Sequence, residues 1–312
     1  MKYPGWVNHP AERQPSPALH PAFTPACNNG VMKKTARLHF LVLIVLLVLV
    51  LGLLVLDRLQ RRWIFQPRIN QTSTAAAPPG ATDVWIDFRS AVSKQEVRLH
   101  GLWWPQAQPE APVLLYLHGA RWDVRASTAR MRRMHSLGFS VLGVDYRGFG
   151  RSSTELPSES LVREDAHAAW DWLAVKQPKA KRFIFGHSLG GAIAVQLSAE
   201  VTDDAGLMLE GTFSSIPHVV EASKWGWLPV DWLITQRFDS LSRIDRVGVP
   251  VLVVHGSQDQ LIPPTLGQSL YQHAAQPKRF ELVQGGAHHS TNALGQAQYR
   301  RALRELFGLS GV

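Results

Sequence analysis

A single serine carries the strongest chemical signal in the chain. Residues 186–190 have the sequence GHSLG, the G-x-S-x-G pattern of a nucleophilic serine on a tight turn between a strand and a helix. An apolar run typical of a buried strand precedes the turn, and an apolar helical stretch follows it. The pattern predicts that Ser188 attacks a carbonyl carbon while the amide of Leu189 stabilises the negative oxygen. The other residues of this turn are Gly186, His187 and Gly190.

A serine hydroxyl becomes a good nucleophile when a base removes its proton, and a histidine held by a carboxylate is the usual base. On a strand–turn–helix of this kind the partners follow in the order serine, acid, histidine. Asp259 follows the apolar run 251–256, and His288 follows the run 280–283. Because the carboxyl ends of parallel strands meet at one edge of a sheet, we expect both residues beside the serine.

Each of these partners has a rival nearby. His289 directly follows His288, and only one of the two can serve because successive side chains of a loop point apart. Glu210 ends another predicted strand and could hold the histidine in place of Asp259. Asp145 also ends a predicted strand, but it precedes the serine, and we interpret it as a carboxylate that bonds a turn.

A second donor for the negative oxygen is expected in the turn after the third predicted strand. This turn has the sequence HGAR, and a His-Gly turn directs the amide of the next residue, Ala120, at the nucleophile. The chain contains no metal-binding pattern such as H-E-x-x-H. Its single cysteine, Cys27, can form neither an internal disulfide nor a cysteine-based metal site. We therefore expect neither a metal nor a cofactor.

Apolar runs that alternate with helical patterns must position these residues. Strands are expected at 84–88, 97–104, 113–118, 140–145, 182–186, 206–210, 251–256 and 280–283, and helices at 123–137, 158–176, 189–200, 264–275 and 292–307. Such alternation predicts an α/β fold with a doubly wound, mostly parallel sheet. The Trp- and Pro-rich segment 213–246 is predicted to be a small helical lid over the site, or aromatic packing on the sheet.

The net charge of +9 is concentrated near the start of the chain. Residues 1–68 hold nine Lys or Arg against two acidic residues, whereas the remaining 244 residues hold 24 basic and 22 acidic residues. A body with a charge near +2 lacks the extended basic face that a nucleic acid requires, so we expect no nucleic-acid partner.

The segment 38–56 contains no charged side chain, and its 19 residues would form a helix about 28 Å long, close to the thickness of a bilayer core. We predict a membrane anchor here, preceded by a disordered basic N-terminus (1–37) and followed by a juxtamembrane segment and linker (57–82) and a catalytic body (83–312). A cleavable signal peptide is the alternative, although the apolar run is longer than a signal core. Basic residues flank the anchor on both sides. A start at Met32 would favour a body outside the cytoplasm.

Several stretches resemble the membrane-anchored α/β-hydrolases related to serine aminopeptidases, which include protein depalmitoylases and lysophospholipid lipases. These stretches are LLYLHG (114–119), GFSVLGVDYRGFGRS (138–152), FGHSLGG (185–191), LEGTFS (209–214), VLVVHGSQD (251–259) and GGAH (285–288). The resemblance covers 84–308. It implies an α/β-hydrolase fold, a triad of Ser188, Asp259 and His288, and oxyanion donors at Ala120 and Leu189. Many members have Asn and small residues after His-Gly, whereas this chain has Ala-Arg-Trp.

The predicted chemistry transfers an acyl group to water through an acyl-enzyme. Esters, thioesters and amides all suit this machinery, and the anchor together with the Trp-rich segment favours lipid-like acyl substrates at a membrane. A peptidase, an acyltransferase and a catalytically silent binding protein remain the alternatives. The oligomeric state is not indicated. Five arginines after the oxyanion turn could face anionic headgroups or form a solvated helix face: Arg121, Arg125, Arg130, Arg132 and Arg133.

Overall fold

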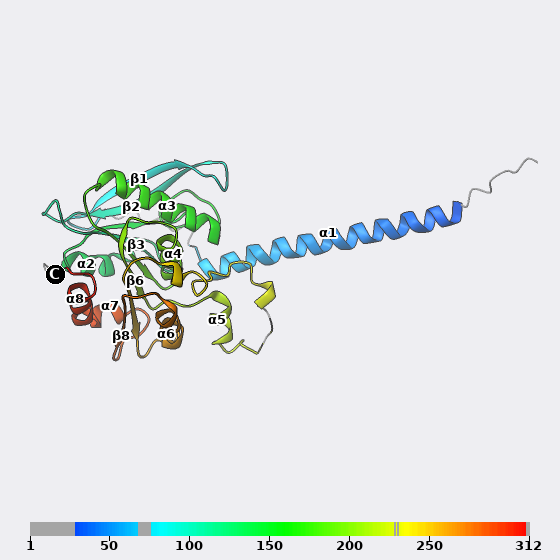
Figure 1. The fold of residues 1–312 in the computed structure, drawn as a ribbon. Helices are drawn as coiled ribbons and strands as arrows, with labels where there is room; N and C mark the ends of the chain where they lie inside the picture. The colour runs from blue at the N-terminus through cyan, green and yellow to red at the C-terminus, as the bar shows by residue number, and fades with distance from the viewer. Residues whose placement is uncertain (1–28, 68–75, 228, 230, 310–312) are drawn as a thin grey trace, which may run out of the picture. The chain divides into compact units, whose positions relative to one another are not determined.

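The computed structural model describes residues 29–67, 76–227, 229 and 231–309. The chain divides into two compact units, one that ends at Gly52 and one that begins at Leu53 and contains the sheet (Figure 1). The first 28 residues of the predicted disordered N-terminus lie outside the described part of the chain.

An eight-stranded sheet forms the centre of the second unit. Its strand order is β1-β2-β4-β3-β5-β6-β7-β8. The β1–β2 and β2–β4 pairs are antiparallel, and the strands from β4 across to β8 run parallel. The bounds are β1 Thr82–Arg89, β2 Glu96–Trp104, β3 Val113–Leu117, β4 Ser140–Val144, β5 Arg182–His187, β6 Asp204–Glu210, β7 Val251–Gly256 and β8 Lys278–Val283. This confirms the predicted fold class, and each predicted strand occurs with its ends shifted by at most two residues.

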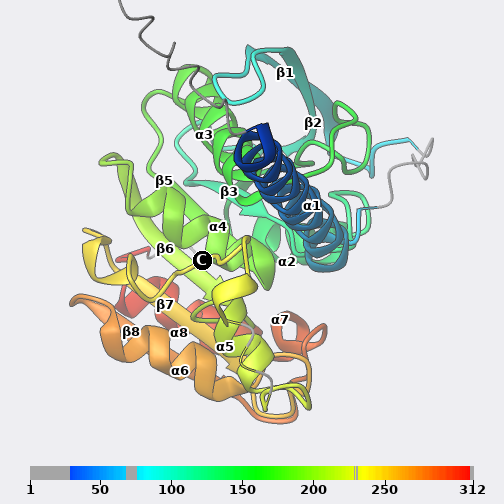
Figure 2. The same cartoon turned by 90° about the vertical axis from the view of Figure 1, so that its right-hand side faces the viewer.

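The helices cover both faces of this sheet (Figure 2). On β3, Leu115 and Leu117 belong to one core cluster, and Leu114 and Tyr116 belong to the other, as the alternation of side chains along a strand requires. The first cluster includes residues of α3 (Glu159–Lys176), α4 (Leu189–Ser198) and α6 (Pro264–His273), and the second includes residues of α2 (Thr128–Ser136) and α8 (Gln296–Glu305). Because both faces of the sheet are buried, the side chains on both sides of each central strand must be apolar. This explains why these strands are continuous apolar runs in the sequence.

Two predicted helices differ from those observed. The pattern 292–307 forms two helices, α7 (Thr291–Leu294) and α8, separated by Gly295. A Cβ on this glycine would approach Val283 Cγ2 to 2.8 Å, so the chain is packed closely against β8 at the break. The pattern 123–137 becomes helical only at Thr128, because the Asp123 side chain accepts from the amide of Ala126 and closes a turn first.

The apolar N-terminal segment belongs to a longer helix than predicted, α1 (Asn29–Phe65). Residues Arg37–Phe65 of this helix, with a mean hydropathy of 3.3 in the most apolar window, are long and apolar enough to cross a membrane. The end of α1 is part of the second unit, and Phe65 is fully buried there. The first part of the predicted juxtamembrane segment and linker (57–82) is thus helical, since residues 57–65 belong to α1.

A buried ion pair fastens the β1–β2 edge of the sheet to α3. The Arg147 guanidinium contacts Asp165 at 2.7 Å with both side chains fully buried, and it also donates to Glu164 and to Ser90 after β1. Burying a charge is tolerated only when its partners remain in place.

We therefore expect Arg147→Ala to lower the free energy of unfolding by about 3–5 kcal/mol, since Asp165 is left as an unpaired buried charge. Arg163→Gln is the control, because the Arg163–Glu200 pair is half exposed and such pairs contribute about 0–1 kcal/mol. Thermal and denaturant unfolding of the detergent-solubilised chain measures the change in the free energy of unfolding for each variant. Equal decreases in the two variants would contradict the stabilising role of the buried Arg147–Asp165 pair.

Candidate active site

The turn between β5 and α4 holds Ser188 in a rarely populated backbone conformation, with φ 55° and ψ −123°. A Cβ on Gly186 would lie 2.3 Å from the carbonyl oxygen of Gly190, and a Cβ on Gly190 would lie 2.1 Å from that of Leu117. Only glycine fits at these two positions. The sequence pattern thus has a steric cause, and the strained serine costs about 1–3 kcal/mol that the surrounding structure must offset.

Residues of β6 and the loop after it hold this turn from the other side. The Ser188 amide donates to the carbonyl of Glu210 at 2.9 Å, and the Thr212 hydroxyl donates to the carbonyl of Ser188 at 2.8 Å. The serine is therefore fixed at the carboxyl edge of the sheet.

The loops after β7 and β8 bring the two predicted partners to this serine. His288 Nε2 lies 3.0 Å from Ser188 Oγ, and His288 Nδ1 lies 2.7 Å from Asp259 Oδ2. Both distances are within hydrogen-bond range, so the three side chains form an uninterrupted chain of contacts.

The environment of Asp259 keeps its carboxylate ionised. Burial opposes ionisation, but contacts with His255 and His288 and the amide of Ile262 outweigh burial and hold the pKa of Asp259 well below its usual range. The amide of Leu261 also donates to this carboxylate, at 3.0 Å. An ionised Asp259 accepts a hydrogen bond from the N–H group at His288 Nδ1, which leaves Nε2 as the acceptor facing the serine hydroxyl.

The rival residues have other partners. His289 stacks on Trp122 with ring centroids 5.1 Å apart, and burial lowers its pKa. Glu210 is fully buried and accepts from Arg130 and Tyr299. The Asp145 carboxylate accepts a hydrogen bond from the amide of Val124 and contacts the ring of His100 on β2. It therefore links the loop after β3 to β2.

The predicted oxyanion turn lies directly against the nucleophile. A Cβ on Gly119 would be 3.1 Å from Ser188 Cβ, so a side chain at this position would crowd the serine. Leu189 is the first residue of α4, where amides have no partner within the helix. Among the backbone hydrogen bonds of the described residues, the Ala120 amide donates to none. The next residue, Arg121, has a left-handed φ of 72°, and its amide donates to the carbonyl of Phe65 at 2.8 Å.

A cavity of about 200 Å³ opens beside these groups, and the end of α1 forms part of its wall. Trp63, Ile64 and Gln66 line it together with the serine and His288. These residues were not among the predicted site residues, because they fall in the segment predicted to be juxtamembrane. The one available signal was the apolar pair Ile64–Phe65, which follows two arginines and lies beyond the 38–56 segment.

The segment 213–246 contributes its first part to the same cavity. Phe213, Ile216 and Val219 line it, the last two from α5 (Ile216–Glu221). The tryptophans that suggested aromatic packing do not pack on the sheet, because Trp225, Trp227 and Trp232 are 52%, 74% and 78% exposed.

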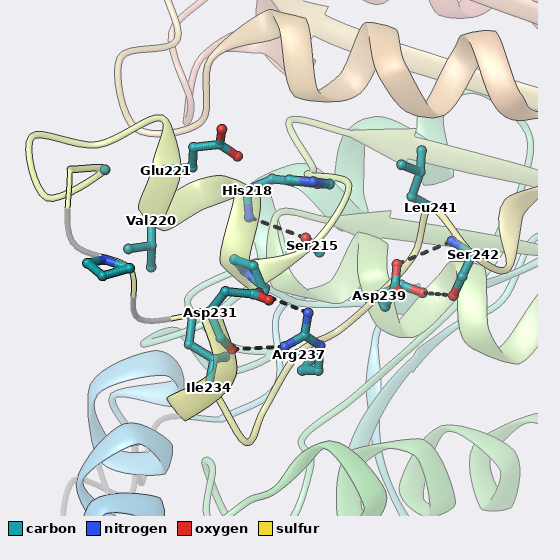
Figure 3. Close-up of a pocket in the computed structure, with 13 residues that line it drawn as sticks. Ser215, His218, Val220, Glu221, Asp231, Ile234, Arg237, Asp239, Leu241 and Ser242 are labelled. Atoms are coloured by element: carbon teal, nitrogen blue, oxygen red, sulfur yellow. Dashed lines mark hydrogen bonds and ion pairs between the residues drawn. The ribbon is translucent and has the colours of Figure 1, made fainter.

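A second cavity, of about 670 Å³, lies between α5 and residues 231–242 (Figure 3). Its polar groups are largely paired with one another, since Arg237 bonds Asp231 and Asp239 accepts from Ser242. It contains neither Ser188 nor His288.

Three histidines near the serine could also meet a metal ion. His187, His288 and His289 each place one ring nitrogen within 4.8 Å of the others. His187 Nε2 donates to the carbonyl of His288, and both nitrogens of His288 face Ser188 and Asp259. A metal bound here would replace the contact between His288 and the serine.

The five arginines after the oxyanion turn do not form one solvated face. Arg130 is buried against Glu210, Arg125 pairs with Asp83, and Arg132 lies over the ring of Trp104. Arg130 and Arg125 therefore belong neither to a solvated helix face nor to a surface that could contact headgroups, whereas Arg121 and Arg132 are exposed.

Comparison with known proteins agrees with this architecture. Residues 107–243 match the family described as "Serine aminopeptidase, S33". Uncharacterized proteins from two Mycobacterium tuberculosis strains are each 33% identical to this chain over 257 residues, with 81% of this chain and 89% of the relative covered. The chain belongs to the α/β-hydrolase family related to serine aminopeptidases.

Two further comparisons within the α/β-hydrolases extend this result. A lysophosphatidylserine lipase of Danio rerio is 31% identical over 216 residues, covering 62% of this chain, and the chain spans 56% of that relative's length. An esterase of Pyrococcus furiosus has the same fold, with a TM-score of 0.61, 17% identity and coverage of 76% of this chain and 99% of the esterase.

We expect Phe65→Ala to lower the free energy of unfolding of this hydrolase by about 3–5 kcal/mol, because the ring is fully buried and packs on Phe238 with centroids 5.7 Å apart. Leu59→Ala is the matched control, because Leu59 lies on the same helix and is 57% exposed. This substitution should change the free energy of unfolding little. Unfolding midpoints in detergent test this. Similar values for the two variants would mean that the end of α1 is not an integral part of the catalytic body.

Proposed function

We propose that this chain is a serine hydrolase that cleaves acyl ester or thioester bonds. The observation that carries the proposal is the pair of contacts that join Ser188 to His288 and His288 to Asp259, at 3.0 and 2.7 Å. Ester-cleaving relatives and the strained serine turn support it.

In the proposed reaction, Ser188 Oγ attacks the carbonyl carbon while its proton passes to His288 Nε2. The amides of Leu189 and Ala120 stabilise the oxyanion. Collapse of the intermediate expels the alcohol or thiol, which takes the proton from His288 and leaves an acyl-serine. Water then attacks the acyl carbon and gives a proton to His288 Nε2. His288 passes this proton to Ser188 Oγ as the bond to the acyl group breaks, which releases the carboxylic acid and restores the free serine.

We further propose that α1 anchors the hydrolase in a membrane and that its substrates are lipid-like. The length and hydropathy of residues Arg37–Phe65 support the anchor. The mainly apolar wall of the cavity, which includes Ile64 and Trp63 at the end of the same helix, supports an acyl chain as ligand. An aminopeptidase function is less favoured, because no Asp or Glu lines the described cavity to bind a substrate amine.

The proposal is tested with the full chain in detergent, treated with a tagged fluorophosphonate and assayed on nitrophenyl esters of graded chain length. We expect labelling and turnover that disappear in Ser188→Ala and fall by at least about 1,000-fold in His288→Asn. His289→Asn is the matched control and should still be labelled. A folded wild-type chain that is not labelled would contradict the proposal, and loss of labelling in His289→Asn alone would reassign the base.

Asp259→Asn should lower kcat by about 10,000-fold, since an amide favours the wrong tautomer of the histidine. The carboxylate also stabilises the fold, because its pKa is lower in the folded than in the unfolded chain. That stabilisation is complete above the unfolded pKa of about 3.9 and is lost as the pH falls below it. Unfolding measured from pH 7 to pH 2 should therefore show the stability difference between wild type and variant shrinking below about pH 4; a constant difference would refute this role.

A further inference from the structure

The helix α1 ends at a strained residue beside the active site. Gln66 has a left-handed φ of 46°, and its amide donates to the carbonyl of Arg62 at 3.0 Å. Glycine is the usual residue at such a helix end, because a Cβ makes the left-handed conformation unfavourable. Gln66 nevertheless carries a side chain here, and it lines the cavity that contains Ser188. A strained residue of this kind persists only where its contacts hold it.

The contacts of this helix end are made to Arg121, the residue that follows the predicted oxyanion donor Ala120. The Arg121 amide donates to the carbonyl of Phe65 at 2.8 Å, and Arg121 Nε donates to Gln66 Oε1 at 2.9 Å. Arg121 is itself left-handed, with φ 72°. Two strained residues, one at the end of α1 and one in the turn after β3, are thus joined by hydrogen bonds that fix the conformation of both.

The peptide group between Gly119 and Ala120 is held from the other side. The carbonyl of Gly119 accepts a hydrogen bond from His118 Nδ1 at 2.8 Å. Burial lowers the pKa of His118, so the ring is neutral and its single proton is on Nδ1. In a trans peptide the C=O and N–H groups point in opposite directions, so the N–H of Ala120 points away from this histidine.

The direction of the Ala120 amide therefore depends on two neighbouring peptide groups. The preceding group is fixed by His118, and the following group, which contains the Arg121 amide, is fixed by Phe65. Turning the Ala120 amide away from the serine would strain or break one of these two hydrogen bonds. An oxyanion donor that is fixed before the substrate binds needs little reorganisation during the reaction.

The end of α1 is itself well anchored in the catalytic body, so it can serve as a support. Phe65 is fully buried and packs on Phe238. One turn and two turns earlier, Gln60 accepts from the amide of Thr235, and Asp57 accepts from its hydroxyl. The carbonyl of Phe65 is therefore held in position independently of the turn that it supports.

We infer that the end of α1 is a functional part of the oxyanion site, in which Phe65 and Gln66 hold Arg121 so that the Ala120 amide stays directed at the reacting carbonyl. Gln66 is a positioning residue, because it acts through Arg121 and not on the substrate. The inference rests on the proposed acyl transfer, since that reaction is the one that creates an oxyanion. The residues that join the apolar run to the sheet are then required for the chemistry as well as for attachment.

The first test measures kcat and KM of the full-length chain in detergent on a nitrophenyl ester. Gln66→Leu removes the acceptor for Arg121 Nε, and we expect kcat to fall about five- to thirtyfold while KM changes less than about twofold, because the Ala120 amide acts in the transition state. Gln66→Glu keeps an acceptor oxygen for Arg121 and should retain kcat within about threefold. Equal losses in the two variants, or a loss that appears in KM alone, would overturn the inference.

Gln60→Leu is the matched control for this test. It removes a glutamine from the same helix whose side chain bonds the carbonyl of Leu233 and the amide of Thr235, and not the oxyanion turn. We expect the wild-type kcat. A loss as large as that of Gln66→Leu would mean that kcat depends on the general docking of α1 and would refute a specific role of Gln66.

The second test determines whether Gln66 acts through Arg121. Arg121→Met removes the same hydrogen bond from the other side and should lower kcat by a similar factor, also where Gln66→Leu fails to fold. In Gln66→Leu/Arg121→Met we expect about the loss of one single variant, because the two residues share one interaction, whereas independent effects would multiply. Multiplied losses would show that Gln66 acts on the substrate directly and would contradict a positioning role.

A trifluoromethyl ketone with the acyl chain of the ester tests the oxyanion site itself, because its adduct with the serine carries a negative oxygen. Its inhibition constant should rise in Gln66→Leu by the factor by which kcat/KM falls, whereas inhibition by the corresponding fatty acid should change less than about twofold. An unchanged constant for the ketone would overturn the inference.

Fluorophosphonate labelling of Ser188 in the wild-type chain separates the two levels of the argument. If the serine is labelled and the ester is cleaved, but the Gln66 and Arg121 variants match the wild type, the proposed hydrolase function stands and this inference fails. If the wild-type chain is neither labelled nor active, the proposed function fails and the inference fails with it.

Discussion

Ser188 sits in a backbone conformation that other elements must hold in place, and much of the site follows from that requirement. Gly186 and Gly190 are needed in the turn because a Cβ on either residue would collide with a backbone carbonyl, that of Gly190 or that of Leu117. The carbonyl of Glu210 and the hydroxyl of Thr212 hold the serine from β6 and the following loop. A parallel sheet with both faces covered provides the rigid edge on which such strain can be stored.

The catalytic body includes more of the chain than its sheet and covering helices. Phe65 is fully buried, and its carbonyl accepts from the amide of Arg121 immediately after the oxyanion turn. Gln60 and Asp57 bond Thr235 in the segment after α5. The residues that follow the apolar run thus hold the turn after β3 and the segment around Thr235. Two hydrogen bonds join this segment to the residue after the oxyanion turn, from the Arg121 amide to the carbonyl of Phe65 and from Arg121 Nε to Gln66 Oε1.

The sheet and the reactive side chains could be predicted from sequence because their signals are local. Buried parallel strands are continuous apolar runs, and the serine turn requires glycines at fixed positions. The pairing of Arg130 with Glu210 could not be predicted, because the two residues are 80 positions apart and each resembles a surface charge. The docking of Phe65 was missed for a related reason: an apolar pair next to arginines also suits a membrane boundary, and only tertiary packing distinguishes the two. The break at Gly295 likewise depends on contact with β8.

The charges around the serine favour the direction in which the proposed proton transfer runs. Asp259 is held ionised and stabilises positive charge on His288, while the guanidinium of Arg130 lines the cavity that contains Ser188 and would stabilise negative charge there. Burial, together with Arg130, lowers the pKa values of His187 and His289, so these rings stay neutral and add no competing positive charge that would disfavour protonation of His288. Attack by the serine creates a cation at the histidine and an anion at the substrate oxygen. The site places a fixed charge of the opposite sign near each, and because both fixed charges are in place before the substrate binds, little reorganisation is needed during the reaction.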